Sequence, residues 1–144
     1  GTPDVILIGT GSEVQLAVAA AAQLAEQGVA ARVVSMPCRE WFDEQDQGYK
    51  DSVIPPEVTA RVSVEAGISQ GWREVVGDAG RIVSINHYGA SAAGGLLFTE
   101  FGFTPEAVVA AAQESLAAAT EATAATAAAV KEAASGPVGT ADTE

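Results

Sequence analysis

The chain has 144 residues and a formal net charge of −12 at pH 7, with seven basic against nineteen acidic side chains. That length suits one compact domain and argues against a cofactor enzyme with separate cofactor and substrate domains. The acidity argues against nucleic acid and anionic membranes as partners, because the chain repels phosphate groups. A single cysteine, Cys38, excludes an internal disulfide and a cysteine-based metal cluster. The chain starts Gly1-Thr2-Pro3 without a methionine, so we expect a piece of a larger protein.

Hydrophobic patterning predicts strands that alternate with helices over most of the chain. Short apolar runs predict four strands, at Val5–Ile8, Ala31–Met36, Arg61–Glu65 and Arg81–Ile85. Helical spacing and helix stop signals predict helices at Glu13–Gln27, Cys38–Asp46, Gln70–Val76 and Gly94–Phe101, with Gln47–Pro56 as a connection. This alternation predicts right-handed βαβ units and an α/β fold, in which helices cover a mostly parallel sheet.

A last helix is expected to begin at Thr104-Pro105-Glu106, where Thr104 caps the helix, Pro105 occupies the first turn and Glu106 complements the dipole. Its apolar stripe fades after Leu116, and the chain becomes rich in Ala and Thr. We therefore divide the chain into a domain of residues 1–118 and an extension of residues 119–144. The extension is predicted to be a frayed helix followed by a disordered end, because it has little apolar surface to bury.

The loop after the first strand is the sharpest candidate for a binding site. Gly9-Thr10-Gly11-Ser12 leads from a strand into a helix, where backbone N–H groups favour anions in open α/β sheets. A dinucleotide fingerprint would need a third glycine at the position of Val14, and an acid at the end of the second strand. Both are missing, so a tight turn with a capping box is the preferred interpretation, and both Thr10 with Glu13 and Ser12 with Gln15 have the spacing of such a box. A possible anion nest at Thr10, Gly11 and Ser12 remains open.

Three other groups of residues have structural explanations that we prefer. Gly89–Ala93 resembles a nucleophile elbow around Ser91, but no helix pattern starts directly after Ser91, and His87 lies on the same segment. Cys38 lacks a nearby histidine in sequence and is interpreted as a half-buried structural cysteine. The acids between Glu40 and Asp46 lack the spacing of a calcium loop. The residues alone therefore predict no catalytic, cofactor-binding or metal-binding set.

The ordered set of segments resembles the C-terminal (third) domain of transketolases from about Asp4 to Leu116. The segments that carry the resemblance are Asp4–Val14, Arg32–Pro37, Trp41–Asp46, Tyr49–Pro55, Val64–Gly67 with Trp72 and Val76-Gly77, Tyr88–Ala92, and Glu100–Thr104. The family usually has proline where this chain has Ala93, and phenylalanine is common near His87-Tyr88. The resemblance implies a three-layer α/β fold around a mostly parallel five-stranded sheet.

The resemblance also implies a function for the parent enzyme. Transketolases use thiamine diphosphate and Mg or Ca to transfer a two-carbon ketol unit from a ketose phosphate to an aldose phosphate. In this family the cofactor, metal and substrate groups belong to the two preceding domains, and none maps onto this sequence. The chain is therefore expected to be cytoplasmic, to bind no cofactor itself and to be inactive alone. Its expected role is structural, with the preceding domains of the same chain and the second subunit of a homodimer as partners.

Two alternatives from other classes stay open at this point. The same type of domain closes the related 2-oxoacid dehydrogenase subunits and docks an acyltransferase, so the chain could be a partner-docking domain. A regulatory anion-binding module around Thr10, Gly11 and Ser12 is the second alternative.

Overall fold

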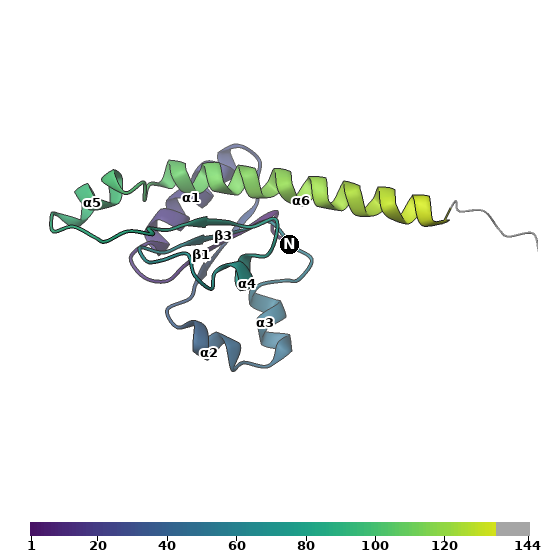
Figure 1. Ribbon diagram of the computed structural model, residues 1–144, viewed down its shortest axis with the longest axis horizontal. Helices are drawn as coiled ribbons and strands as arrows, with labels where there is room; N and C mark the ends of the chain where they lie inside the picture. The colour runs from purple at the N-terminus through teal and green to yellow at the C-terminus, as the bar shows by residue number, and fades with distance from the viewer. Residues whose placement is uncertain (135–144) are drawn as a thin grey trace, which may run out of the picture.

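A parallel sheet of four strands lies between helices in the computed structural model, which describes residues 1–134 (Figure 1). The strands are β1 (Val5–Gly9), β2 (Ala31–Ser35), β3 (Arg61–Val64) and β4 (Arg81–Val83), in the spatial order β2-β1-β3-β4. β1 is central and pairs with both β2 and β3, while β4 pairs with β3. The expected α/β class and the parallel sheet are confirmed.

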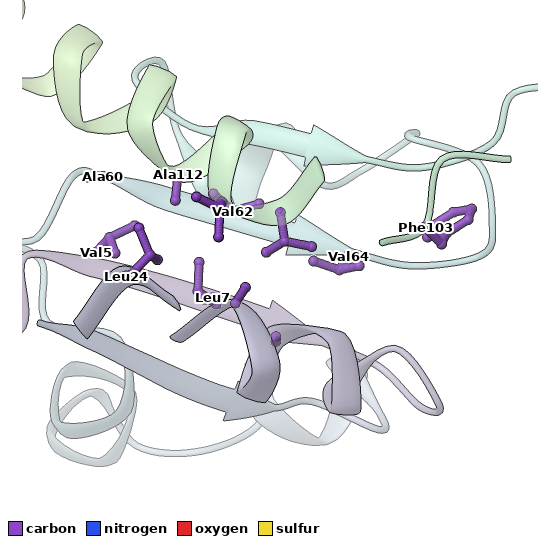
Figure 2. Close-up of a cluster of buried hydrophobic side chains, with 12 residues drawn as sticks. Val5, Leu7, Leu24, Ala60, Val62, Val64, Phe103 and Ala112 are labelled. Carbon is purple, nitrogen blue, oxygen red and sulfur yellow. The ribbon is translucent and has the colours of Figure 1, made fainter. Parts of the chain in front are cut away.

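The central strand β1 is buried on both faces, as its continuous apolar run predicted. Val5 and Leu7 point to one face of the sheet and join the apolar cluster of Figure 2. Ile6 and Ile8 point to the other face and join a second apolar cluster that contains Trp72. Two helix layers are therefore needed, one against each cluster.

Helices α1 (Val14–Glu26) and α6 (Pro105–Ala134) cover the face of Val5 and Leu7, where α1 contributes Leu24 and α6 contributes Ala112 (Figure 2). The opposite face is covered by three short helices, α2 (Arg39–Asp43), α3 (Gln47–Val53) and α4 (Arg73–Val76). Helix α5 (Gly94–Glu100) lies beyond the sheet (Figure 1). The three-layer arrangement is confirmed.

Two sequence expectations need correction. The described residues 1–134 form four strands and not five, because the Gly-, Ala- and Ser-rich segment after β4 has low strand propensity and the other connections are helical.

The expected connection Gln47–Pro56 contains a helix, α3. The Asp46 side chain caps its first turn by accepting a hydrogen bond from the Tyr49 N–H at 2.9 Å. At its other end Arg32 of β2 donates to the carbonyls of Ser52 and Val53, at 2.9 and 3.2 Å. Helix α3 therefore depends on a long-range contact as well as on its own sequence.

Helix α6 begins as the sequence predicted. The hydroxyl of Thr104 accepts a hydrogen bond from the Ala107 N–H at 3.2 Å, and Pro105 is the first helical residue. The helix continues without a break past residue 118 to Ala134, so the predicted domain boundary falls inside a helix. The division into a domain and an extension stays a prediction, and the expected disordered end begins outside the described residues.

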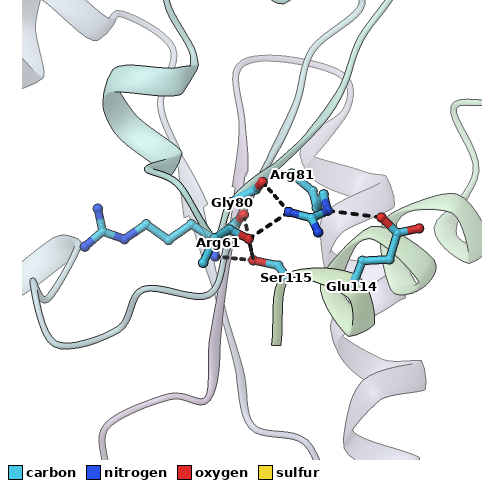
Figure 3. A network of polar contacts seen from close by, with 6 residues as sticks. Arg61, Gly80, Arg81, Glu114 and Ser115 are labelled. Atoms are coloured by element: carbon cyan, nitrogen blue, oxygen red, sulfur yellow. Dashed lines mark hydrogen bonds and ion pairs between the residues drawn. The ribbon is translucent and has the colours of Figure 1, made fainter. Parts of the chain in front are cut away.

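A polar network, buried at Ser115 and exposed at Glu114, fastens α6 to the amino ends of β3 and β4 (Figure 3). The fully buried Ser115 hydroxyl accepts from the Arg61 N–H at 3.0 Å and donates to the Ala79 carbonyl at 2.9 Å. Glu114, the residue before Ser115 in α6, forms an ion pair with Arg81 at 3.0 Å.

The Arg61 guanidinium points to the opposite helix layer. It donates to the carbonyls of Pro55, Val58 and Val75, and its burial lowers the pKa of Arg61. The start of β3 therefore connects both layers.

Ser115→Ala is expected to lower the free energy of unfolding by about 1–3 kcal/mol, because it leaves the half-buried Arg61 N–H without its acceptor and the Ala79 carbonyl without its donor. Urea denaturation followed by circular dichroism measures the change. Thr126→Ala is the matched control, since the Thr126 hydroxyl is exposed and bonds only to the Ala122 carbonyl of its own helix. Equal stability of the two variants would contradict the role assigned to Ser115.

Gly80→Ala is expected to destabilise the domain by about 1–3 kcal/mol through overpacking. A β-carbon on Gly80 would lie 2.5 Å from the Val76 carbonyl oxygen, a distance that forces the α4–β4 turn to move. Gly89→Ala is the control, because a β-carbon there meets nothing within 4 Å. Both changes reduce the entropy of the unfolded chain in the same way, so the difference between their melting temperatures isolates the clash. Equal melting temperatures would show that the turn accommodates the methyl group.

Candidate functional site

The topology places a crevice at the carboxyl ends of β1 and β3. The chain leaves β1 toward β2 on one side and later returns to form β3 on the other side, so the connections after β1 and β3 diverge. In open α/β sheets, ligands bind at such a switch point. A depression of about 270 Å³ lies at this edge of the sheet, and it is lined by Thr10, Met36, Pro37, Cys38, Arg39, Glu40, Glu65, Gln70 and Trp72.

The predicted anion nest lies beside this crevice, at the start of α1. Thr10 is half-buried, while Gly11 and Ser12 are exposed. The expected tight turn is present, because the Val14 N–H donates to the Gly11 carbonyl at 3.1 Å. The expected capping boxes are wrong, since the residue at the cap position is Glu13 and its side chain makes no capping bond to α1.

Glu13 instead directs its carboxylate across the sheet edge. Its side chain is buried, and Oε1 accepts a hydrogen bond from the Ala66 N–H at 2.9 Å, which joins the loop after β1 to the loop after β3. The other oxygen, Oε2, lies 3.4 Å from the position that a β-carbon on Gly11 would occupy. The anion at the start of α1 is therefore one of the protein's own carboxylates, which opposes the approach of a second anion.

The Glu65 carboxylate lines the crevice itself. Glu65, the residue after β3, accepts a hydrogen bond from the indole Nε1 of the buried Trp72 at 2.7 Å. Glu13 and Glu65 thus fix the loop of residues 65–72 at two points. Sequence reasoning missed both roles, because the partners Ala66 and Trp72 are reached only in the folded chain. The sequence offers only the positions of the two acids as a signal. Glu13 follows the loop after the first strand, and Glu65 stands at the end of the third.

Cys38 also lines the crevice, immediately before α2. It is half-buried, and its thiol lies 3.4 Å from the Glu40 carboxylate. The pKa of Glu40 is lowered, first by a hydrogen bond from its own backbone N–H and then by the thiol. The thiol donates to this carboxylate, so the Cys38 side chain already has a partner within its own segment. This geometry favours the structural interpretation of Cys38.

The remaining candidate residues take structural positions. His87 and Ser91 lie in the exposed segment after β4, where the His87 ring packs against Phe101 with 5.0 Å between ring centroids. Asp43 lies 3.7 Å from Arg39, and Asp46 caps α3. Within residues 1–134, no group of three or more His, Cys, Asp and Glu side chains is arranged to hold a metal ion. No helix in this part of the chain is long and apolar enough to cross a membrane.

Comparison with known proteins gives this architecture a family. The family model of the transketolase-like TK C-terminal domain matches residues 1–104. The chain is 65% identical over 114 residues to a transketolase from Mycobacterium leprae, and 56% identical over 116 residues to transketolase 1 from Escherichia coli. These matches cover 79% and 81% of the chain, but only 16% and 18% of the two relatives.

Solved structures agree with the sequence relatives. A transketolase from Leishmania mexicana matches with a TM-score of 0.72 and 41% identity over 79% of this chain and 16% of that chain. A likeness of fold assigns no ligand to the crevice at the carboxyl ends of β1 and β3. The chain belongs to the family of transketolase-like C-terminal domains.

Proposed function

We propose that this chain serves as the C-terminal domain of a transketolase that transfers two-carbon ketol units from ketose phosphates to aldose phosphates. The observation that carries the proposal is the 65% identity to the Mycobacterium leprae transketolase, over a segment that is 16% of that protein. The complete enzyme would use thiamine diphosphate with Mg or Ca, in the pentose phosphate pathway and in the cytoplasm. A relative from Solanum tuberosum is named chloroplastic, so the compartment varies within the family.

The residues of this chain do not fit the diphosphate of the cofactor. The carboxylates of Glu13 and Glu65 lie at this edge of the sheet, and both are already bonded to donors of the loop of residues 65–72. Two fixed negative charges at this edge oppose a diphosphate group, and the chain as a whole carries a net charge of −12. We therefore assign the cofactor, the metal and the chemistry to the rest of the enzyme.

The proposed role of the domain is to support the fold and the dimer of the complete enzyme. One structural relative, a split-gene transketolase described as an inactive β4 tetramer, is 26% identical and has a TM-score of 0.58. The match covers 81% of this chain and 40% of that one. A transketolase piece that assembles without activity supports the proposal that this chain is inactive alone. The alternative of an acyltransferase-docking domain finds no support in these relatives, which are named transketolases.

The isolated chain is expected to show no turnover of xylulose 5-phosphate with ribose 5-phosphate in the presence of thiamine diphosphate and Mg²⁺. A chimera of the Mycobacterium leprae enzyme, in which this chain replaces the matching 114 residues, is expected to be active. The unmodified relative serves as the positive control in the same coupled assay. Activity of the isolated chain would contradict the structural role, and an inactive but correctly assembled chimera would contradict the transketolase assignment.

The anion nest at Thr10, Gly11 and Ser12 remains a prediction, and the Glu13 carboxylate makes it directly testable. Titration of the wild-type chain with inorganic phosphate is expected to leave the fluorescence of Trp72 without a saturable change. Glu13→Gln keeps an acceptor for the Ala66 N–H but removes the charge, so it is the variant most able to admit phosphate. Glu121→Gln, on exposed helix α6, is the matched control for charge. Saturable binding by the wild-type chain would establish the nest.

A further inference from the structure

The segment after β4 forms an exposed surface that the fold of this chain leaves uncovered. Every residue from 86 to 96 is exposed, and we call this segment the arm. It carries Tyr88, which is 99% exposed, and Leu96, which is 55% exposed, at the start of α5. Ile68, in the neighbouring loop after β3, is 58% exposed. In Figure 1 the arm and α5 project from the body at the end opposite the free end of α6.

The arm and the loop of Ile68 are held together as one surface. The side-chain oxygen of Asn86 accepts from both the N–H and the hydroxyl of Ser69, at 3.0 Å in each case. The Ile85 N–H donates to the Gly67 carbonyl at 3.0 Å. In the described chain, the next backbone–backbone bond donated after this one is from the Leu96 N–H to the Ala93 carbonyl, inside the arm itself. The base of the arm is thus anchored while its length has little support from the domain.

The composition of this surface is that of an interface core. Residues 82–99 contain no Asp, Glu, Lys or Arg, and neither do residues 66–72, in a chain whose net charge is −12. Charged residues are depleted at the centre of protein interfaces, and apolar side chains exposed together in one patch mark contact sites. Glycines and alanines fill the middle of the arm, so a partner can approach its backbone closely. Such a segment has no core of its own to offset its ordering entropy.

We propose that the arm, together with Ile68, docks against the remainder of a transketolase polypeptide, that is, the part which this domain does not contain. The proposal rests on the proposed function above. The arm lies within residues 1–104, which match the family model, and the relatives carry this domain in chains about six times as long as the aligned segment. A contact common to the family is therefore expected inside this range.

Other surfaces and other occupants fit these observations less well. The surface around the exposed Trp41 carries Glu40, Asp43 and Glu44, which is unlike an interface core. The exposed end of α6 lies beyond the residues that match the family model. A second copy of this chain brings a further net charge of −12, so two free copies repel each other.

Hydrogen–deuterium exchange tests the docking surface in the free chain and in the active-site-bearing chimera described above. Backbone amides of residues 86–96 are expected to exchange at least about tenfold more slowly in the chimera. Residues 120–134 of α6 are expected to exchange equally in both and serve as the internal control. In the chimera, Tyr88→Asp is expected to abolish much of this protection, whereas Val130→Asp, at an exposed apolar residue of α6, is expected to leave it unchanged.

Each outcome bears on one of the two proposals. An active chimera whose arm exchanges as fast as in the free chain overturns the docking surface and leaves the proposed function intact. A protected arm in an inactive chimera supports docking and contradicts the assigned activity. Protection that grows with the concentration of the free chain would identify a second copy as the occupant and overturn the proposal. If the chimera does not assemble, the free chain is mixed with the Mycobacterium leprae enzyme that lacks the matching segment, and an unprotected arm there overturns the proposal.

Discussion

The complete burial of β1 is the constraint on which the rest of the structure depends. Val5, Leu7, Ile6 and Ile8 alternate between two faces, and both edges of the strand are paired, so apolar layers are needed above and below it. The long helices α1 and α6 supply one layer, and three short helices with Trp72 supply the other. This arrangement leaves the carboxyl edge of the sheet as the place where loops meet. The loop after β1, Cys38 and Glu65 consequently lie at this edge, on connections that the burial of β1 has brought together.

Local pattern predicted the elements whose stability is set by their own sequence. The apolar run of β1, the spacing of α1 and the Thr104-Pro105 start of α6 each have a short-range cause, and each was found within a residue or two. Helix α3 was not predicted, because it has only seven residues and depends on a contact from another element. Arg32 of β2 donates hydrogen bonds to the carbonyls at its end. The number of strands came from the family resemblance and not from the residues, whose own pattern indicated the four that the structure contains.

The candidate site also depends on contacts between residues that are far apart in the sequence. The loop from Thr10 to Ser12 was identified correctly as the connection at the end of β1, because strand, glycines and helix are contiguous in sequence. What that loop can bind is decided by Glu13, whose partner Ala66 is 53 residues away. A capping box and a cross-sheet bond use the same acid at the same position, and only the path of β3 determines which of them forms. The carboxylate pair of Glu13 and Glu65 is therefore a tertiary property, and no spacing rule contains it.

The carboxyl edge of the sheet has two parts of opposite character, the crevice at β1 and β3 and the arm beyond β4. At β1 and β3, the buried carboxylate of Glu13 and the half-buried carboxylate of Glu65 accept from donors of the loop after β3 and oppose an anionic ligand. Beyond β4, the chain presents an arm without charge and with few bonds to its own domain. The crevice is bordered by acidic side chains, while the arm exposes apolar area that water does not favour. At the arm, the free energy to be gained is therefore that of contact with another protein surface, as the proposed docking requires.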